Sequence, residues 1–409
     1  MDKQTELTKL TKEEFLAKIE SGQKQFEKIQ VIATDLTKIL LNDLSISDSV
    51  FTEVNFGKSH FKNCEFENVD IQQCNFEKTK FFKPKFIFSN IHDSNFSHAR
   101  LRRAEFHGTK LKNCLFQSSE LNYSRFDYGN FNFNLRSSVL ENTNFSDANW
   151  ISSKFKSTII KQSNFAKILI TNCSFEVVHF SDSDFNTAKL QRVEFISLDL
   201  SKINFSGTNL KYVSFVVCQI KSSDFFESYH IESTFTSSFI EKTNFIAAIL
   251  YQGNFRDSCI KNSSFSEAFL NEANFEKVQL NNVNLANTNL EMSKFKKVDF
   301  RQSNLKQANC KESQLEKVTF KKSKIEDTCF SFADLSHVSL INHHLIRVNF
   351  YKTNLFKAKL NKSTFEKCNF TESNLSHAIL KKTTLRNNKY RITDFFCIDM
   401  ENIVFTNET

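Results

Sequence analysis

The stretch LENTNFSDANWISSKFKSTIIKQSNF, residues 140–165, decides the fold because a large apolar residue recurs in it at every fifth position. The same step runs from Phe51 to Phe131 and from Leu140 to Phe405, and most of the 47 Phe residues of the chain occupy it. A period of five matches neither the 3.6 residues of a helical turn nor the two of a strand. The chain must therefore turn once per repeat, so that every fifth side chain points inward.

Small side chains usually stand two residues before each large one, as at Ser94 and Ala99, and a polar residue such as Asn95 or Asn164 directly precedes it. Four turns of five residues close a coil of about 20 residues, and such coils stack at the parallel-strand spacing of about 4.8 Å. The small residues leave room for the large ones to stack along the axis.

This arrangement, (Ser/Thr/Ala/Val/Cys)-(Asn/Asp/other)-(Phe/Leu)-x-x, resembles the pentapeptide-repeat family over roughly residues 46–405. The resemblance implies an all-β fold, a right-handed quadrilateral parallel β-helix. Some members of the family are thought to mimic duplex DNA and bind type II topoisomerases. Others are secreted effectors of intracellular bacteria.

The N-terminal segment predicts a short capping helix over residues 11–21, since Thr11 and Glu14 have capping-box spacing and Gly22 can end the helix. No matching C-terminal helix is visible. The last coil is therefore expected to be lightly covered or used for association, and an end-to-end dimer is one possibility.

Between Phe131 and Leu135 the step is four residues instead of five, so we expect a bend or an interrupted ladder between Phe131 and Leu140. The predicted organisation is an N-terminal cap with irregular repeats (1–45), a first repeat stack (46–134) and a second, longer stack (135–409).

Composition excludes several classes of protein. The chain has only 6 Gly and 1 Pro, whereas an average chain of this length has about 29 and about 20, which argues against Gly-rich linkers and phosphate loops. No apolar run approaches the ~18 residues of a membrane span, and the first residues do not form a secretory signal. We expect the protein in the cytoplasm of the producing cell, or in a host cell by a route without a cleavable signal peptide.

The ten Cys residues are expected to be structural thiols, because six of them (Cys64, Cys74, Cys114, Cys173, Cys218 and Cys368) occupy the small inward position and no CxxC pair exists. His343 also falls at that position, where a distorted corner is favoured over a ligand. The five-residue step leaves little room for the long loops that build catalytic clefts. No enzymatic activity, cofactor, metal or small-molecule substrate is predicted.

Charge offers the remaining functional signal. Residues 46–285 carry 26 basic and 25 acidic side chains, whereas residues 286–390 carry 20 Lys and Arg against 9 Asp and Glu. A step of 20 aligns one basic column, which we name the basic stripe: Lys277, Lys297, Lys317, His337, Lys357 and His377. A solvated charge ladder is the simpler interpretation; the functional one is docking of an anionic partner, strengthened as the two His protonate at mildly acid pH.

The predicted function is a non-enzymatic interaction protein that binds a macromolecular partner through its outer faces, and a bacterial host-directed effector is one form of it. A protein partner or an anionic membrane surface is favoured over nucleic acid, because nearly all Phe side chains point inward. The alternative is a modulator of DNA gyrase of the quinolone-resistance type. DNA mimicry, however, requires an acidic surface, and this chain has a net charge of +8.

Overall fold

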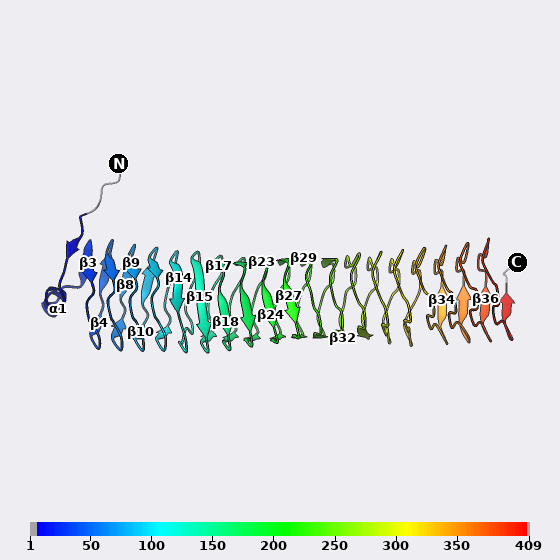
Figure 1. The fold of residues 1–409 in the computed structure, drawn as a ribbon, viewed down its shortest axis with the longest axis horizontal. Helices are drawn as coiled ribbons and strands as arrows, with labels where there is room; N and C mark the ends of the chain where they lie inside the picture. Colours follow the sequence, from blue (N-terminus) through cyan, green and yellow to red (C-terminus); the bar gives the residue numbers. More distant parts are fainter. Residues whose placement is uncertain (1–5, 407–409) are drawn as a thin grey trace. The chain divides into compact units, whose positions relative to one another are not determined.

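The computed structural model describes residues 6–406 of the chain. They fall into two compact units, unit 1 (Met1–Asp199) and unit 2 (Leu200–Thr409). Each unit is a right-handed quadrilateral parallel β-helix of the predicted kind, in which strands of successive coils lie side by side (Figure 1). Most strand partners are 20 residues apart, as in the pairing of Lys80 with Arg100.

From residue 6 onward, unit 1 contains one helix, α1 (Lys12–Glu20), and its strands are two to seven residues long. The strands are β1 (Thr8–Lys9), β2 (Gln25–Glu27), β3 (Ile29–Ile32), β4 (Leu40–Asn42), β5 (Ser45–Ser47), β6 (Val50–Thr52), β7 (His60–Lys62), β8 (Glu65–Glu67), β9 (Asp70–Gln72), β10 (Lys80–Phe82), β11 (Lys85–Ile87), β12 (Asn90–His92), β13 (Arg100–Arg102), β14 (Lys110–Leu115), β15 (Asn130–Arg136), β16 (Val139–Glu141), β17 (Asn149–Ile151), β18 (Lys154–Lys156), β19 (Ile159–Lys161), β20 (Leu169–Thr171), β21 (Ser174–Glu176), β22 (His179–Ser181), β23 (Lys189–Gln191) and β24 (Glu194–Ile196).

Unit 2 has fewer regular strands, because many of its coils pair through isolated bridges such as Asn284 with Asn304. Its strands are β25 (Asp199–Ser201), which begins at the last residue of unit 1, β26 (Asn209–Lys211), β27 (Ser214–Val216), β28 (Gln219–Lys221), β29 (Tyr229–Ile231), β30 (Phe239–Glu241), β31 (Ile249–Tyr251), β32 (Cys259–Lys261), β33 (Gln279–Asn281), β34 (His344–Ile346), β35 (Thr364–Glu366), β36 (Thr384–Arg386) and β37 (Val404–Thr406).

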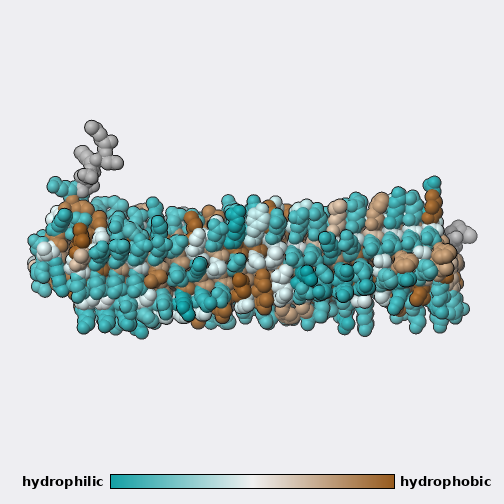
Figure 2. Space-filling model, viewed as in Figure 1, coloured by the Kyte–Doolittle hydropathy of each residue, from teal (hydrophilic) through white to brown (hydrophobic). Residues whose placement is uncertain are grey.

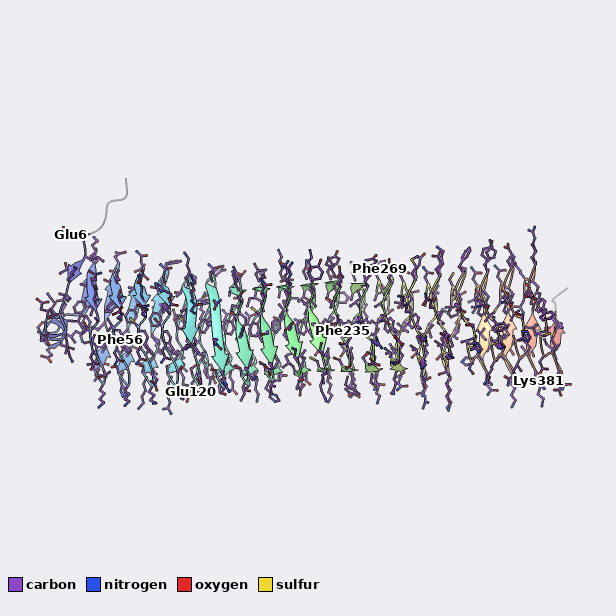
Figure 3. All side chains as sticks on the ribbon, viewed as in Figure 1. Glu6, Phe56, Glu120, Phe235, Phe269 and Lys381 are labelled. Atoms are coloured by element: carbon purple, nitrogen blue, oxygen red, sulfur yellow. The ribbon has the colours of Figure 1, made fainter. Side chains whose placement is uncertain are left out.

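The large inward residues form the core. Phe205 and Phe225 stack with ring centroids 4.8 Å apart, and Phe245 and Phe265 with centroids 4.6 Å apart. Figure 3 shows Phe235 between the strands, whereas Glu120, Phe269 and Lys381 project at the outer edge. The small inward residues bind the coils together, because hydroxyls such as that of Ser233 donate to a carbonyl of the preceding coil.

Each corner lies two residues after a large inward residue and has left-handed backbone, with φ of 61° at Lys58 and 50° at Asn63. This conformation costs a non-glycine residue about 1–2 kcal/mol. A hydrogen bond to the next coil offsets that cost: the Lys58 amide donates to Glu77 and the Asn63 amide to Phe82, each across 2.9 Å. Corner side chains therefore point to solvent at a fixed repeat, which positions any surface site of this fold.

The predicted N-terminal cap is confirmed. The Thr11 hydroxyl accepts from the Glu14 amide, and the Glu14 carboxylate accepts from the Thr11 amide. Helix α1 buries Phe15, whose ring lies 5.2 Å from Phe26 and 6.4 Å from Phe51. The helix thus covers the large inward residues of the first coils.

The four-residue step removes a corner. Leu111 pairs with Phe131 but Cys114 pairs with Phe133, so the register shifts by one residue between these positions. Strand β15 runs straight through, without a positive φ from Asn130 to Arg136, and Phe133 is buried at the small inward position. Pairing continues from Leu135 to the next coil. The expected interruption of the ladder is therefore not found here, and a division of the stacks between residues 134 and 135 stays a prediction.

Candidate functional site

The six residues of the basic stripe lie at successive corners of unit 2. Their φ angles range from 55° at Lys357 to 60° at Lys277, and all six side chains are exposed. The Lys277 amide donates to Lys296 of the next coil and the Lys297 amide to Glu316, so one coil separates each stripe residue from the next. The side chains consequently form one column at the predicted spacing of a single coil.

Acidic residues compensate only part of this column. Glu316 lies 2.9 Å from Lys317 Nζ and 3.7 Å from Lys296 Nζ, and the hydrogen bond from Lys317 lowers the pKa of the Glu316 carboxyl despite some opposing burial. Glu276, which the sequence also suggested as a partner, lies instead 3.9 Å from Arg256. Within residues 6–406, Lys277 and Lys297 have no carboxylate at ion-pair distance.

The C-terminal half of the stripe carries aromatic rings that the sequence analysis missed. The Phe356 ring lies 5.9 Å from His337 and 5.5 Å from His377, and His377 lies 5.7 Å from Phe396, all edge to face. Lys357 Nζ lies 4.9 Å from the Phe356 ring centre, a cation–π contact. Both Phe residues lie in the column directly before the basic stripe: Phe356 precedes Lys357, and Phe396 lies two coils further along. A search of that column in the sequence would have found them. The stripe therefore combines positive charge with exposed aromatic surface.

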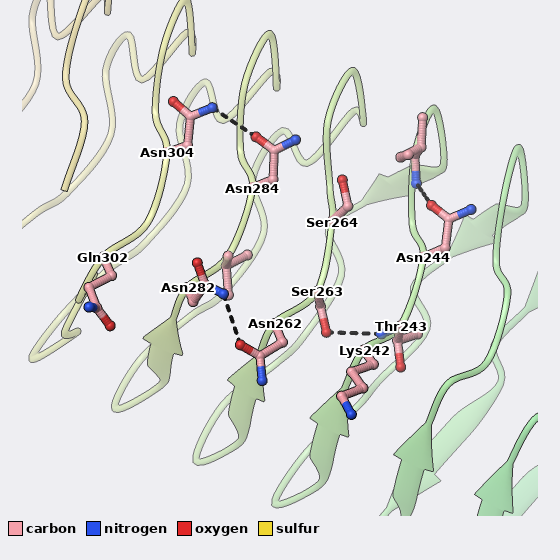
Figure 4. Close-up of a pocket in the computed structure, with 12 residues that line it drawn as sticks. Lys242, Thr243, Asn244, Asn262, Ser263, Ser264, Asn282, Asn284, Gln302 and Asn304 are labelled. Carbon is pink, nitrogen blue, oxygen red and sulfur yellow. Dashed lines mark hydrogen bonds between the residues drawn. The ribbon is translucent and has the colours of Figure 1, made fainter.

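A second feature of unit 2 is an open groove of about 600 Å³ between two columns of polar side chains (Figure 4). Its amides bind one another across coils: Asn282 donates to Asn262 across 2.9 Å and Asn304 to Asn284 across 3.1 Å. The lining residues include no His, Cys or carboxylate, and Lys242 is the ionisable one among them. The groove therefore lacks a pair of titratable side chains for acid–base catalysis.

The six inward thiols are buried, as predicted. Burial raises the pKa of the Cys74 thiol to about 11 and that of Cys114 to about 12, which makes both poor nucleophiles at neutral pH. The imidazole of His343 lies between the carbonyls of Ile341 and Phe320. Within residues 6–406 no group of three or more His, Cys, Asp or Glu is placed to hold a metal ion.

The repeats of this chain match family models of known proteins. A family model described as pentapeptide repeat region matches residues 51–126, 168–245, 254–330 and 273–350, and one described as pentapeptide repeats (8 copies) matches residues 349–387. The matches cover more than half of the chain. The chain belongs to the pentapeptide repeat family. Proteins of this family are typically non-catalytic.

Two solved structures illustrate the likeness to other pentapeptide repeat proteins. HetL, a pentapeptide repeat protein involved in heterocyst differentiation regulation from the cyanobacterium Nostoc sp. strain PCC 7120, is 16% identical over 78% of this chain and 96% of its own, with a TM-score of 0.17. Full-length QnrB1, a plasmid-mediated fluoroquinolone resistance protein, is 16% identical over 52% of this chain and 93% of its own, with a TM-score of 0.18. No match among curated proteins was found for this sequence.

The described residues contain no helix that is both long and apolar enough to span a bilayer.

Proposed function

We propose that this pentapeptide repeat protein is a non-enzymatic interaction protein whose basic stripe binds an acidic surface of a protein partner. The observation that carries the proposal is the partly uncompensated column of corner cations in unit 2. A bacterial host-directed effector role is the form of this function that the sequence composition favours.

The corner geometry supports this function because it presents charges as a lattice. Side chains one coil apart are spaced by about 4.8 Å, so several like charges can face one partner surface together. Lys277 and Lys297 keep their full charge available to a partner, because no carboxylate of the described residues neutralises them. The half-buried ring of Phe356 and the exposed ring of Phe396 add apolar contact area beside the cations, as in the centres of protein interfaces.

The test compares two charge-reversal variants in pull-downs from bacterial and eukaryotic lysates. The stripe variant is K297E/K317E/K357E. The control is K322E/K362E/K382E, which reverses three lysines at a different corner of unit 2 with the same left-handed backbone, φ from 56° to 61°. Both variants have the same net charge, so a difference in capture between them does not come from total charge.

The parent and the control should capture the same proteins. The amount captured by the stripe variant should be at least tenfold lower. Raising the salt from about 0.1 to about 0.5 M should release them, because exposed charges are then screened. Equal capture by the stripe variant and the parent at low salt would refute the stripe as the binding surface.

A further inference from the structure

Unit 1 has a second charged surface, on the outward side of strands β4, β7, β10 and β13, which we name the basic face. These strands form a four-stranded parallel sheet, drawn along the lower edge of the blue part of Figure 1. Two outward columns run across it. His60, Lys80 and Arg100 pair in one column, and Lys62, Phe82 and Arg102 pair in the other.

The corner that precedes this sheet adds Lys38, Lys58 and Lys78, whose φ angles lie between 58° and 61°. Their amides donate to carbonyls of the next coil, so they form a third column beside the sheet. All of these cationic side chains are exposed. In each of these three adjacent columns, successive residues are one coil apart. The charged side chains of the columns are almost all positive.

Few acids neutralise the basic face. Arg100 Nε lies 3.4 Å from Glu120, and Lys78 Nζ lies 2.8 Å from Glu77. In the described part of the chain, Lys62, Lys80 and Arg102 have no carboxylate at ion-pair distance. The excess charge of this surface is thus available to a ligand.

Several acidic residues that are close to these cations in the sequence lie on other sheets of unit 1. Glu65 and Glu67 are on strand β8 of another four-stranded sheet, and Asp70 is on strand β9 of a third sheet. The near balance of basic and acidic residues along this part of the sequence therefore conceals a separation of charge by face.

Exposed apolar side chains stand among these cations. Leu40 is 62% exposed at one end of the first column, and Phe82 is 49% exposed between Lys62 and Arg102. They line a shallow groove of about 370 Å³ on the outer side of the sheet. Figure 2 shows hydrophobic residues (brown) scattered over an otherwise hydrophilic surface, so single exposed apolar side chains are ordinary in this molecule. The unusual feature of the basic face is the position of Phe82 between Lys62 and Arg102, two cations without a carboxylate at ion-pair distance within residues 6–406.

We propose that the basic face docks unit 1 onto an anionic lipid membrane. Lys and Arg side chains near an acidic bilayer bind its headgroups, and apolar side chains between them enter the interface. The sheet presents two outward columns on one side, and the corner column lies beside them, so cations of all three columns can face one membrane surface. Single-stranded nucleic acid is less suited, because successive bases stack on successive aromatic rings. The outward aromatic side chains within β4, β7, β10 and β13 are His60 and Phe82, which stand in different columns.

The experiment is co-sedimentation of the full chain with vesicles of phosphatidylcholine alone and of phosphatidylcholine with about a third phosphatidylserine. The face variant is K62E/K80E/R102E, and its control is K110E/K112E/K154E, which reverses three exposed lysines of unit 1 outside the basic face. The control lysines also have no carboxylate at ion-pair distance within residues 6–406. A melting curve for each variant shows whether the fold is retained.

The parent and the control should sediment with the anionic vesicles and not with phosphatidylcholine, whereas the face variant should lose at least about 100-fold in partition coefficient. Phe82→Ser should weaken binding several-fold without changing its salt dependence, because it removes apolar contact and no charge.

Three results would overturn the proposal: no sedimentation of the parent with anionic vesicles, equal losses in the face variant and the control, or retention of a single-stranded oligonucleotide in preference to the vesicles. The stripe variant K297E/K317E/K357E should bind vesicles like the parent. Membrane docking by unit 1 and protein binding by unit 2 can therefore fail independently.

Discussion

His230 should make the folding stability of unit 2 depend on pH. It occupies a large inward position, where Leu210 and Leu250 stand in the neighbouring coils, and it is fully buried. Its Nε2 lies 2.8 Å from the Ser228 hydroxyl, and its Nδ1 has no hydrogen-bond partner. Burial lowers the pKa of His230 from 6.5 to about 3.

The direction of the pH effect on folding stability follows from the protons that the folded and unfolded chains bind. Between pH 6.5 and about 3 the unfolded chain binds a proton at His230 that the folded chain does not bind, so the free energy of unfolding falls as the pH falls. Each pH unit in this range corresponds to about 1.4 kcal/mol, which gives about 2.7 kcal/mol between pH 6.5 and 4.5. Above pH 6.5 the neutral His230 causes no loss in the free energy of unfolding.

The perturbation is His230→Leu, which restores the residue type of the coils above and below. At pH 7.5 the variant should already gain about 1–3 kcal/mol, because it removes a buried nitrogen without a partner. The difference in the free energy of unfolding between the variant and the parent should be about 2.7 kcal/mol larger at pH 4.5 than at pH 7.5. Other titrating groups are shared by both proteins and cancel in the difference.

The measurement is urea unfolding of both proteins at a series of pH values. Hydrogen exchange of residues 225–255 should accompany it, because solenoid stability is largely a sum over neighbouring coils. His179→Leu, at an exposed outward histidine, is the control and should show no such growth. A stability difference between His230→Leu and the parent that stays constant from pH 7.5 to 4.5 would refute a neutral, buried imidazole.

Further predictions concern the core, the thiols, the missing corner and gyrase. Phe205→Ala should cost about 3–5 kcal/mol by leaving a cavity in the stack, and unchanged melting would contradict its inward position. Under native conditions a thiol reagent should modify the exposed Cys397 quickly and Cys74 only on unfolding; rapid reaction of Cys74 would contradict its burial. Hydrogen exchange should show protection of strand β15 at Phe133 equal to that of neighbouring coils, and a local loss there would mean that the register shift weakens the ladder. Gyrase supercoiling with and without a quinolone should be unaffected by micromolar protein, and inhibition or protection would revive the alternative function.

The five-residue period was sufficient to predict stacked coils because it governs nearly every inward position, whereas the right-handed, four-sided geometry was predicted from the resemblance to the pentapeptide-repeat family. Phe205 and Phe245 follow from the five-residue step alone, and the Thr11 capping box follows from two residues at a fixed spacing. The consequence of the four-residue step at Phe131 could not be predicted, because a missing residue can bend a coil or be absorbed by straightening a corner. In the structure the corner is straightened: strand β15 is extended, and Phe133 lies at a small inward position.

Surface sites are harder to predict, because outward positions are free of the constraint that fixes inward ones. The basic stripe was found because its members share the corner position and lie in a segment with an obvious charge excess. The basic face was missed because Lys62 and Arg102 lie 40 residues apart, with acidic residues such as Glu65 and Asp70 between them in the sequence.

In a coil of 20 residues, sequence neighbours point to different faces, whereas residues one coil apart share a column. Summing charge over a sequence window therefore averages the four faces, and a protein with strongly basic columns can appear neutral over most of its length. The relevant quantity for this fold is the charge of each column, because charges about 4.8 Å apart act together on any surface that faces them. For this reason a single reversal such as K62E should have a modest effect on membrane binding, while three reversals on the basic face should have a much larger effect than three reversals spread over different faces.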